Sequence, residues 1–306
     1  MSAFVAMSAA GVIGCIGLGV MGAPICRNLA RKSGRSVLGF DLNPAPLSRL
    51  AADRVVAAAS IGDIMEKADI VFLSLPSGQE VAALAEGTEG LLATARAGQI
   101  VVDLGTSPPA LARHLAQGFA ERGAHFADCP VARTREAAEQ GTLSVMVGAE
   151  REVFERLRPV LGNFATDITH CGPPGAGQVV KILNNMVLVE TVVALSEALA
   201  IARAEGVDGA LLFAALMHGS ADSFALRNHG MKAILPETFP ERAFSARYAR
   251  KDLGYALDLA RMSHLDAAGA NHAARLLDAA IAAGDGDRYW PVLSRILQPG
   301  RPEEKR

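Results

Sequence analysis

The chain has 306 residues, a net charge of −2 and 50% hydrophobic residues, so it is long enough for about two domains. The near-neutral charge gives no sign of nucleic-acid binding. Four cysteines without a CxxC pair indicate reduced thiols and a cytoplasmic protein. Seven scattered histidines without an HExxH spacing predict no metal site.

The first half of the chain alternates β-rich and helical runs, after a loose extension over residues 1–10. Helices are expected over 23–32, from Pro108-Pro109 onward and over 150–161, between strands at 11–16, 36–40, 69–75, 99–104, 124–129, 143–147 and 164–169. This alternation is typical of an α/β dinucleotide-binding domain.

A glycine-rich turn follows the first predicted strand. The run Gly17-Leu18-Gly19-Val20-Met21-Gly22 is a GxGxxG that opens a helix, and Asp41 lies 19 residues after Gly22 at the end of the next strand. Such glycines let the backbone approach a pyrophosphate, and the acid accepts hydrogen bonds from a ribose. A carboxylate would repel a 2′-phosphate, so the sequence favours NAD over NADP, although Arg49 could reach back from the next helix.

Two later strands end in residues that could contact the cofactor. One ends at Leu75-Pro76, and the other is followed by Gly105-Thr106. Residues just past the carboxyl ends of parallel strands line the ligand crevice. Leu75, Pro76 and Thr106 are therefore candidate cofactor contacts, while simple turn and cap roles remain an equal alternative.

Another strand end carries an arginine. Arg133 and Thr134 follow the predicted strand at 124–129, where a guanidinium and a hydroxyl could bind an anionic substrate. The alternative is a surface arginine that pairs with Glu136 or Glu139 on the following helix.

The run Gly172 to Asn185 (GPPGAGQVVKILNN) divides the chain, because nearly everything after it is predicted to be helical. A long helix is expected over 177–205, and Lys181, Asn184 and Asn185 share one face of it. A lysine on so apolar a helix indicates a proton donor at a domain junction, or a lysine that extends its charge into water. Glutamates within the most apolar run, 186–202, argue against a membrane span.

Further helices are expected at 209–218, 223–231, 246–262 and 268–283. The fourth of the helices after residue 176 contains Lys251-Asp252, either as an exposed ion pair or with Lys251 adding positive potential near the cofactor. We therefore expect a Rossmann domain over 1–173 and an all-α domain over 174–306, joined through the long helix.

Together these motifs resemble the β-hydroxyacid dehydrogenase family of the 3-hydroxyisobutyrate dehydrogenase type. Four segments carry the resemblance: 16–30, 128–148, 172–185 and 249–260. It implies a Rossmann domain, an all-α domain and a homodimer or homotetramer. It also implies that Lys181 is catalytic, that Asn185 orients the substrate and that Lys251 lies near cofactor and substrate.

One departure concerns the substrate. Many family members have Ser-Gly-Gly where this chain has Ala132-Arg133-Thr134, and an Arg-Thr there is similar to the 3-sulfolactaldehyde reductase branch. The expected reaction is NAD(H)-dependent interconversion of a small anionic aldehyde and its primary alcohol, with sulfolactaldehyde as a candidate. The alternatives are a 3-hydroxyisobutyrate or tartronate semialdehyde enzyme and, more distantly, a non-catalytic NAD-binding protein.

Overall fold

The computed structural model describes residues 11–241 and 243–298, so the extension expected over residues 1–10 lies outside the described residues. The chain forms two compact units, the first ending at Lys181 and the second beginning at Ile182. The sequence placed this boundary at 173/174, before the long helix. In the structure it falls inside that helix, so both units share one continuous element.

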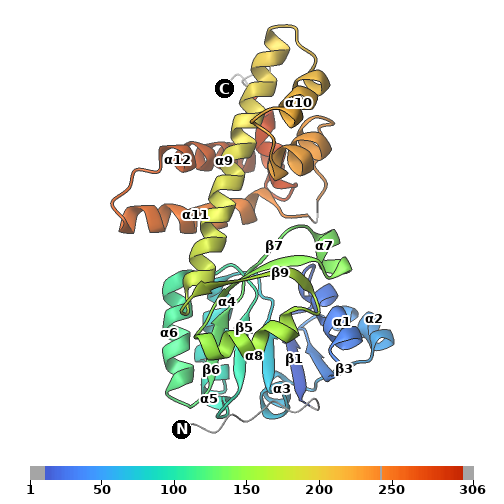
Figure 1. Ribbon diagram of the computed structural model, residues 1–306, viewed down its shortest axis with the longest axis vertical. Coiled ribbons are helices and arrows are strands. Elements are labelled where there is room, and N and C mark those ends of the chain that lie inside the picture. Colours follow the sequence, from blue (N-terminus) through green and yellow to red (C-terminus); the bar gives the residue numbers. More distant parts are fainter. Residues whose placement is uncertain (1–10, 242, 299–306) are drawn as a thin grey trace. The chain divides into compact units, whose positions relative to one another are not determined.

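The first unit contains a mixed sheet with helices packed around it (Figure 1). Its strand order is β3-β2-β1-β4-β5-β6-β8-β7, and β9 pairs with β8. The six strands from β3 to β6 are parallel, whereas β8 is antiparallel to β6 and β7. The strands are β1 (Val12–Ile16), β2 (Ser36–Phe40), β3 (Val55–Ala57), β4 (Ile70–Leu73), β5 (Ile100–Asp103), β6 (His125–Asp128), β7 (Val131–Ala132), β8 (Leu143–Gly148) and β9 (Ala165–Gly172). The order 3-2-1-4-5-6 confirms the predicted Rossmann arrangement.

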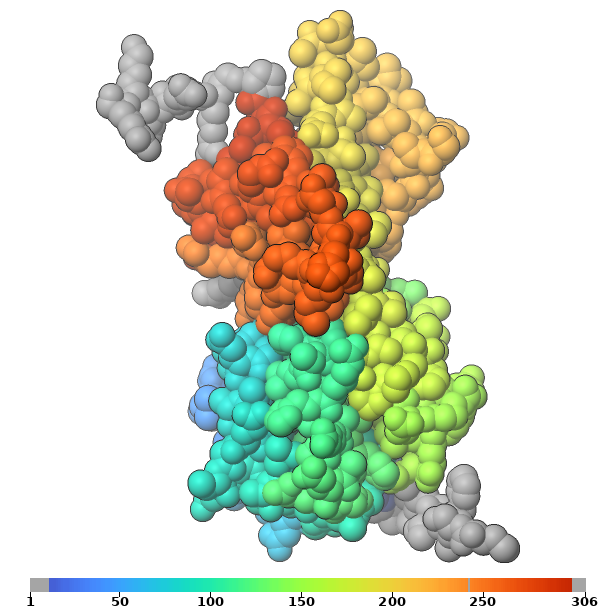
Figure 2. All heavy atoms as spheres, turned by 90° about the vertical axis from the view of Figure 1, so that its left-hand side faces the viewer, coloured from blue at the N-terminus to red at the C-terminus, as the bar shows by residue number. Residues whose placement is uncertain are grey.

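Helices cover both faces of this sheet, as crossover connections between parallel strands require. They are α1 (Gly22–Lys32), α2 (Ala45–Leu50), α3 (Ile61–Lys67), α4 (Gly78–Glu86), α5 (Leu91–Thr94), α6 (Pro109–Ala120), α7 (Arg135–Gln140) and α8 (Arg151–Leu161), with a 3-10 turn η1 (Ala51–Asp53). In the space-filling view, α6 forms part of the green surface at the front (Figure 2).

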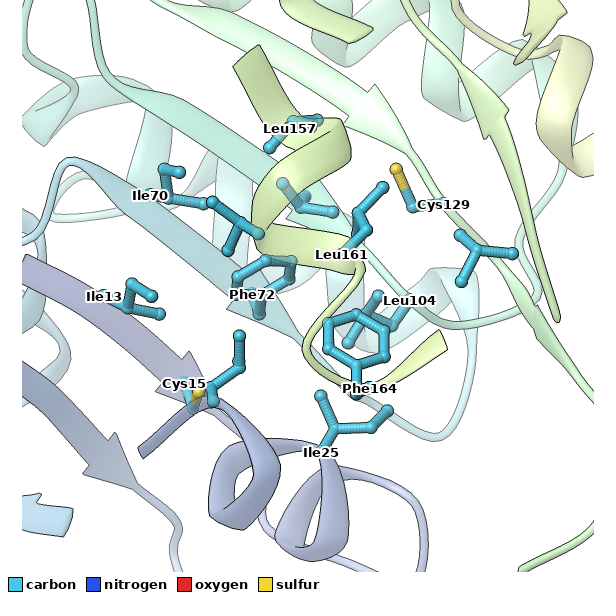
Figure 3. Close-up of a cluster of buried hydrophobic side chains, with 14 of the residues drawn as sticks. Ile13, Cys15, Ile25, Ile70, Phe72, Leu104, Cys129, Leu157, Leu161 and Phe164 are labelled. Carbon is cyan, nitrogen blue, oxygen red and sulfur yellow. The ribbon is translucent and has the colours of Figure 1, made fainter. Parts of the chain in front are cut away.

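Alternate residues of the central strands supply the two cores of the first unit. Phe72 faces the core under α1 and α8, whereas Val71 and Leu73 face the core on the other side. Phe72 meets Phe164 edge to face, with ring centroids 5.9 Å apart (Figure 3). The sheet is therefore apolar on both faces, which leaves its edges and strand ends for polar chemistry.

The second unit is helical, as predicted. It contains most of α9 (Ala176–Ala204), then α10 (Gly209–His218), η2 (Leu226–Ile234), α11 (Ala246–Met262), α12 (Ala268–Ala280), η3 (Ile281–Asp285) and η4 (Trp290–Leu297). The predicted helix at 223–231 is π-helical over Leu226–Ile234. By length and composition alone α9 could cross a membrane, but its buried side chains, such as Ile182, Val192 and Leu199, belong to the core of this unit.

Candidate functional site

The glycine turn after β1 is built on contacts that only glycine allows. A Cβ at Gly17, where φ is 86°, would lie 2.3 Å from the carbonyl oxygen of Ser74, and a Cβ at Gly22 would lie 2.0 Å from that of Gly17. A Cβ at Gly19 would meet nothing within 4 Å, so backbone there is open to a ligand. The turn is tight at both ends and accessible in its middle, as a pyrophosphate site requires.

The helix after this turn directs the positive end of its dipole at the turn. Met21 precedes α1, and its side chain makes no capping hydrogen bond. Val20 is exposed and Met21 is half-buried, so both border the open part of the turn. The positive end of the helix dipole favours an anion at this point.

Asp41, the predicted ribose acid, follows β2 directly and lies against the glycine turn. One carboxylate oxygen accepts the N–H of Leu18 at 2.5 Å, and the other accepts the N–H of Asn43 at 2.8 Å. These bonds fix the carboxylate beside the turn. Each oxygen keeps a further lone pair, which a ribose hydroxyl could use.

The strand ends gather the other predicted cofactor contacts in the first unit. The Cβ position of Gly17 lies 3.2 Å from a methyl carbon of Leu75, and that of Gly105 lies 3.3 Å from the Leu75 carbonyl oxygen. Leu75 therefore lies between the glycine turn and the loop that carries Thr106, with Pro76 next to it. This edge is where the strand order reverses between β1 and β4, the usual ligand crevice of such sheets. The residues present fit a nicotinamide dinucleotide.

The side chain of Arg133 is turned toward β8 and β9. Its guanidinium donates to the carbonyl oxygen of Thr142 at 2.6 Å and to the hydroxyl of Thr166 at 2.9 Å, and it forms an ion pair of 2.6 Å with Asp167. Hydrogen bonds from Thr166 and Arg133 lower the pKa of Asp167. The alternative prediction of a surface ion pair named the wrong partners, because Arg133 pairs with Asp167 and not with Glu136 or Glu139.

The loop that carries Arg133 has an unusual backbone. Arg133 has φ 88°, a conformation that favours glycine and strains other residues. Thr134 follows it, and its hydroxyl accepts the N–H of Ala137 at 3.3 Å as the N-cap of α7. Both predicted substrate residues therefore have local partners within the first unit.

Lys181 is half-buried in α9 and is the last residue of the first unit. The continuous helix from Ala176 to Ala204 confirms the predicted spacing, with Asn184 and Asn185 three and four residues later on the same helical face.

The second unit brings three of the predicted site residues together around one buried acid. Asn185 donates to a carboxylate oxygen of Asp252 at 2.9 Å, and Asn184 donates to the side-chain oxygen of Asn185 at 3.2 Å. The ammonium group of Lys251 lies 3.2 Å from Asp252 and within 5.5 Å of the ring centroids of Tyr248 and Tyr255. The exposed Lys251–Asp252 pair considered from sequence is wrong, because Asp252 is only 3% exposed.

Asp252 is a residue that sequence reasoning treated only as a neighbour of Lys251. The signal available in the sequence was its position on an amphipathic helix, on the same face as the buried residues Ala249, Leu253 and Ala256.

Among residues 11–241 and 243–298, no group of three or more His, Cys, Asp or Glu side chains lies close enough to hold a metal ion.

Two family models match almost the whole described chain. Residues 12–172 match the NAD binding domain of 6-phosphogluconate dehydrogenase. Residues 175–290 match a domain described as the NAD-binding domain of NADP-dependent 3-hydroxyisobutyrate dehydrogenase. The junction between the two matches lies just before α9.

Curated relatives and solved structures agree with these matches. The chain is 37% identical over 250 residues to 3-hydroxyisobutyrate dehydrogenase of Pseudomonas aeruginosa, covering 80% of this chain and 84% of the relative. It is 33% identical over 292 residues to the NAD-dependent L-serine dehydrogenase of the same organism, covering 94% and 98%. The structure of Mycobacterium tuberculosis 3-hydroxyisobutyrate dehydrogenase with L-serine superposes with a TM-score of 0.85 at 32% identity, covering 94% of this chain and 99% of that one.

Proposed function

Because this chain belongs to the 3-hydroxyisobutyrate dehydrogenase-like β-hydroxyacid dehydrogenase family, we propose that it interconverts a small anionic aldehyde and its primary alcohol with NAD(H). The observation that carries the proposal is α9, where the half-buried Lys181 is followed on one face by Asn184 and Asn185. A basic group beside two amides on an apolar helix suits proton transfer to a bound substrate.

NAD, when bound, would supply or accept the hydride. The chain's part begins with holding the cofactor. The open backbone at Gly19 and the start of α1 suit the pyrophosphate, and Asp41 suits the ribose hydroxyls. The edge formed by Leu75, Pro76 and Thr106 would border the rest of the cofactor, and Lys251 would add positive charge. We propose NAD rather than NADP because Asp41 would repel a 2′-phosphate.

Lys181 is the proposed proton donor and acceptor. During reduction its ammonium group would protonate the aldehyde oxygen as negative charge develops there. During oxidation its neutral amine would accept the proton of the hydroxyl group. Asn184 and Asn185 would hold the substrate, since each side-chain amide keeps a second N–H beyond the bond that it makes to Asn185 or Asp252. Such positioning supplies much of the rate of a bimolecular reaction.

The nature of the substrate's anion depends on Arg133. Its guanidinium already uses three of its five N–H groups on Thr142, Thr166 and Asp167, so a substrate anion would be left with the other two and would lie beside the Asp167 carboxylate, which repels it. A carboxylate-bearing β-hydroxyacid, of the 3-hydroxyisobutyrate or tartronate semialdehyde kind, is therefore the first candidate. The second is a sulfonate such as 3-sulfolactaldehyde, favoured by the strained Arg133-Thr134 loop, since strain of this kind is concentrated at ligand sites.

The test is NADH consumption by the purified protein with four aldehydes: methylmalonate semialdehyde, tartronate semialdehyde, succinate semialdehyde and 3-sulfolactaldehyde. Turnover of at least one, with an observed preference among them, is the expected result. NADH binding without turnover of any of the four would favour a non-catalytic NAD-binding protein and would overturn the proposal.

We also propose a homodimer or homotetramer in the cytoplasm. The oligomer is supported by large apolar side chains exposed on the second unit, among them Val187, Ile201 and Leu211. The location is supported by the four free cysteines of the described residues, which suit a reducing compartment. Sedimentation of the purified protein as a monomer would contradict the first part.

A further inference from the structure

The start of α9 is fastened to the sheet of the first unit by a buried carboxylate. Asp128 ends β6 and is fully buried. One of its oxygens accepts the N–H of Gly175 at 2.6 Å, and the other accepts the N–H of Gln178 at 2.7 Å. Both donors lie at the start of α9, so Asp128 satisfies N–H groups that the helix cannot satisfy itself and opposes the positive end of its dipole.

The side chain of Gln178 connects the same helix turn to the loop after β5. Its carbonyl oxygen accepts the N–H of Ser107 at 3.0 Å, and its amide nitrogen donates to the carbonyl oxygen of Gly105 at 2.9 Å. Gln178 is completely buried, and the two bonds hold both sides of the loop residue Thr106. Asp103 holds the loop from below, since it accepts the N–H of Gly105 and the hydroxyl of Ser107, both at 2.8 Å.

Close packing fixes the helix turn from a third side. A Cβ at Gly177 would lie 2.5 Å from the carbonyl oxygen of Met146 and 2.7 Å from that of Asp128. Only glycine lets the first turn of α9 approach the backbone of β6 and β8 so closely.

The pKa of Asp128 reflects its burial inside the protein. Burial raises this pKa to about 7, although the hydrogen bonds from Gly175 and Gln178 lower it in part.

Lys181 follows Gln178 by three residues, which is less than one helical turn. We propose that Gln178 and Asp128 are positioning residues that fix Lys181 relative to the loop Gly105–Ser107. This inference rests on the proposed function, in which Thr106 borders the cofactor and Lys181 transfers the proton. Gln178 acts through its two hydrogen bonds to the loop, and Asp128 acts by binding the first N–H groups of α9. Neither residue contacts the substrate.

The chain contains a matched control for Gln178. Gln99 is also buried, and its amide nitrogen donates to the carbonyl oxygens of Met65 at 2.9 Å and Ala68 at 2.8 Å. It precedes β5, whereas Gln178 binds the loop that follows β5, so the two amides lie at opposite ends of one strand. Removing either one breaks buried hydrogen bonds and lowers Tm. Only removal of Gln178 loosens the bridge near Lys181.

The experiment compares Gln178→Ala with Gln99→Ala in the full-length protein, using kcat with the preferred aldehyde and the Kd of NADH from fluorescence titration. We expect Gln178→Ala to lower kcat by about 10²-fold, because small misplacements of a reacting group are this costly. Its Kd for NADH should rise by less than about tenfold, because the glycine turn and Asp41 are untouched and only the loop that carries Thr106 is loosened. Gln99→Ala should keep its kcat, since Gln99 lies at the other end of β5. If Gln178→Ala does not fold, Gln178→Met keeps the length of the side chain without its polar bonds.

Equal kcat values for the Gln178 and Gln99 variants would overturn the inference. Lys181→Ala separates this failure from a failure of the proposed function. If Lys181→Ala abolishes turnover while Gln178→Ala behaves like Gln99→Ala, only the positioning role is wrong. If Lys181→Ala keeps wild-type kcat, the proton-transfer role itself is wrong.

Discussion

The carboxylate of Asp41 accepts the backbone N–H of Leu18 at 2.5 Å, so the acid at the end of β2 is tied to the middle of the glycine turn after β1. Leu18 and Asp41 are 23 positions apart in the sequence, and this bond places them side by side at the glycine turn. The bond places negative charge next to the turn, where it can accept ribose hydroxyls and oppose a 2′-phosphate.

Replacing Asp41 by Ala should therefore weaken NAD binding about tenfold or more while weakening NADP much less, because lost hydroxyl contacts affect only NAD and lost repulsion favours NADP. Fluorescence titration with both reduced cofactors measures the two Kd values. Glu66→Ala is the control, since Glu66 is an exposed acid of α3. An equal loss for both cofactors in Asp41→Ala would remove the argument for NAD.

Replacing Lys181 by Met should lower kcat by about 10²–10⁴-fold, the usual contribution of a general acid or base. The Kd of NADH should change little, because the glycine turn and Asp41 are untouched. Lys67→Met serves as the control, since Lys67 is an exposed residue of α3 that pairs with Asp63. A Lys181 variant with kcat close to wild type would exclude the proton-transfer role.

Replacing Arg133 by Gly tests the anion. Glycine adopts φ 88° without strain, which offsets the loss of an exposed ion pair, so the free energy of unfolding should stay within about 1 kcal/mol of wild type. Because the Arg133 guanidinium is already paired with Asp167, we expect the variant to change kcat/KM for carboxylate semialdehydes by less than about threefold. Loss of a direct contact with the substrate would lower kcat/KM by more than this.

The control for this variant is Arg135→Ala, which removes an exposed arginine two residues away that pairs with Glu139. A loss of about 10²-fold restricted to 3-sulfolactaldehyde in Arg133→Gly, but absent from Arg135→Ala, would identify Arg133 as a sulfonate-binding residue. The carboxylate assignment would then be wrong.

His229 should make the protein sensitive to acid. Burial, followed by the charge of Lys232, lowers the pKa of His229 to about 4, and its Nδ1 lies 2.6 Å from the hydroxyl of Tyr289. Between pH 6.5 and 4, His229 binds a proton in the unfolded chain but stays neutral in the folded protein. The free energy of unfolding therefore falls by about 3 kcal/mol as the pH drops through this range.

Urea unfolding of wild type and His229→Asn across this pH range measures the effect, and the variant should lack this part of the pH dependence. His218→Asn is the control, because it replaces an exposed histidine at the end of α10, and this variant should keep the acid dependence. Parallel pH curves for wild type and His229→Asn would contradict the assignment.

The sequence by itself determined the elements whose signals are local. The GxGxxG between a strand and a helix, the acid at the end of β2 and the spacing of Lys181, Asn184 and Asn185 on α9 all depend on neighbours within one turn or one loop. The short strand β3 was missed because three residues carry too little pattern, and η2 was predicted as an ordinary helix because apolar spacing does not distinguish a π-helix.

Only the tertiary structure decided which polar groups meet across long separations. Arg133 pairs with Asp167, Asn185 with Asp252, and Gln178 with the loop after β5, over separations of 34, 67 and 71 residues or more. For Asn185 and Gln178 the partner was set by burial, since a buried polar atom must find its hydrogen bond inside the protein. For the exposed pair of Arg133 and Asp167 it was set by the pairing of β9 with β8, which brings Asp167 within reach of the loop that carries Arg133. No local pattern contains that information, because the chain must fold before those groups are neighbours.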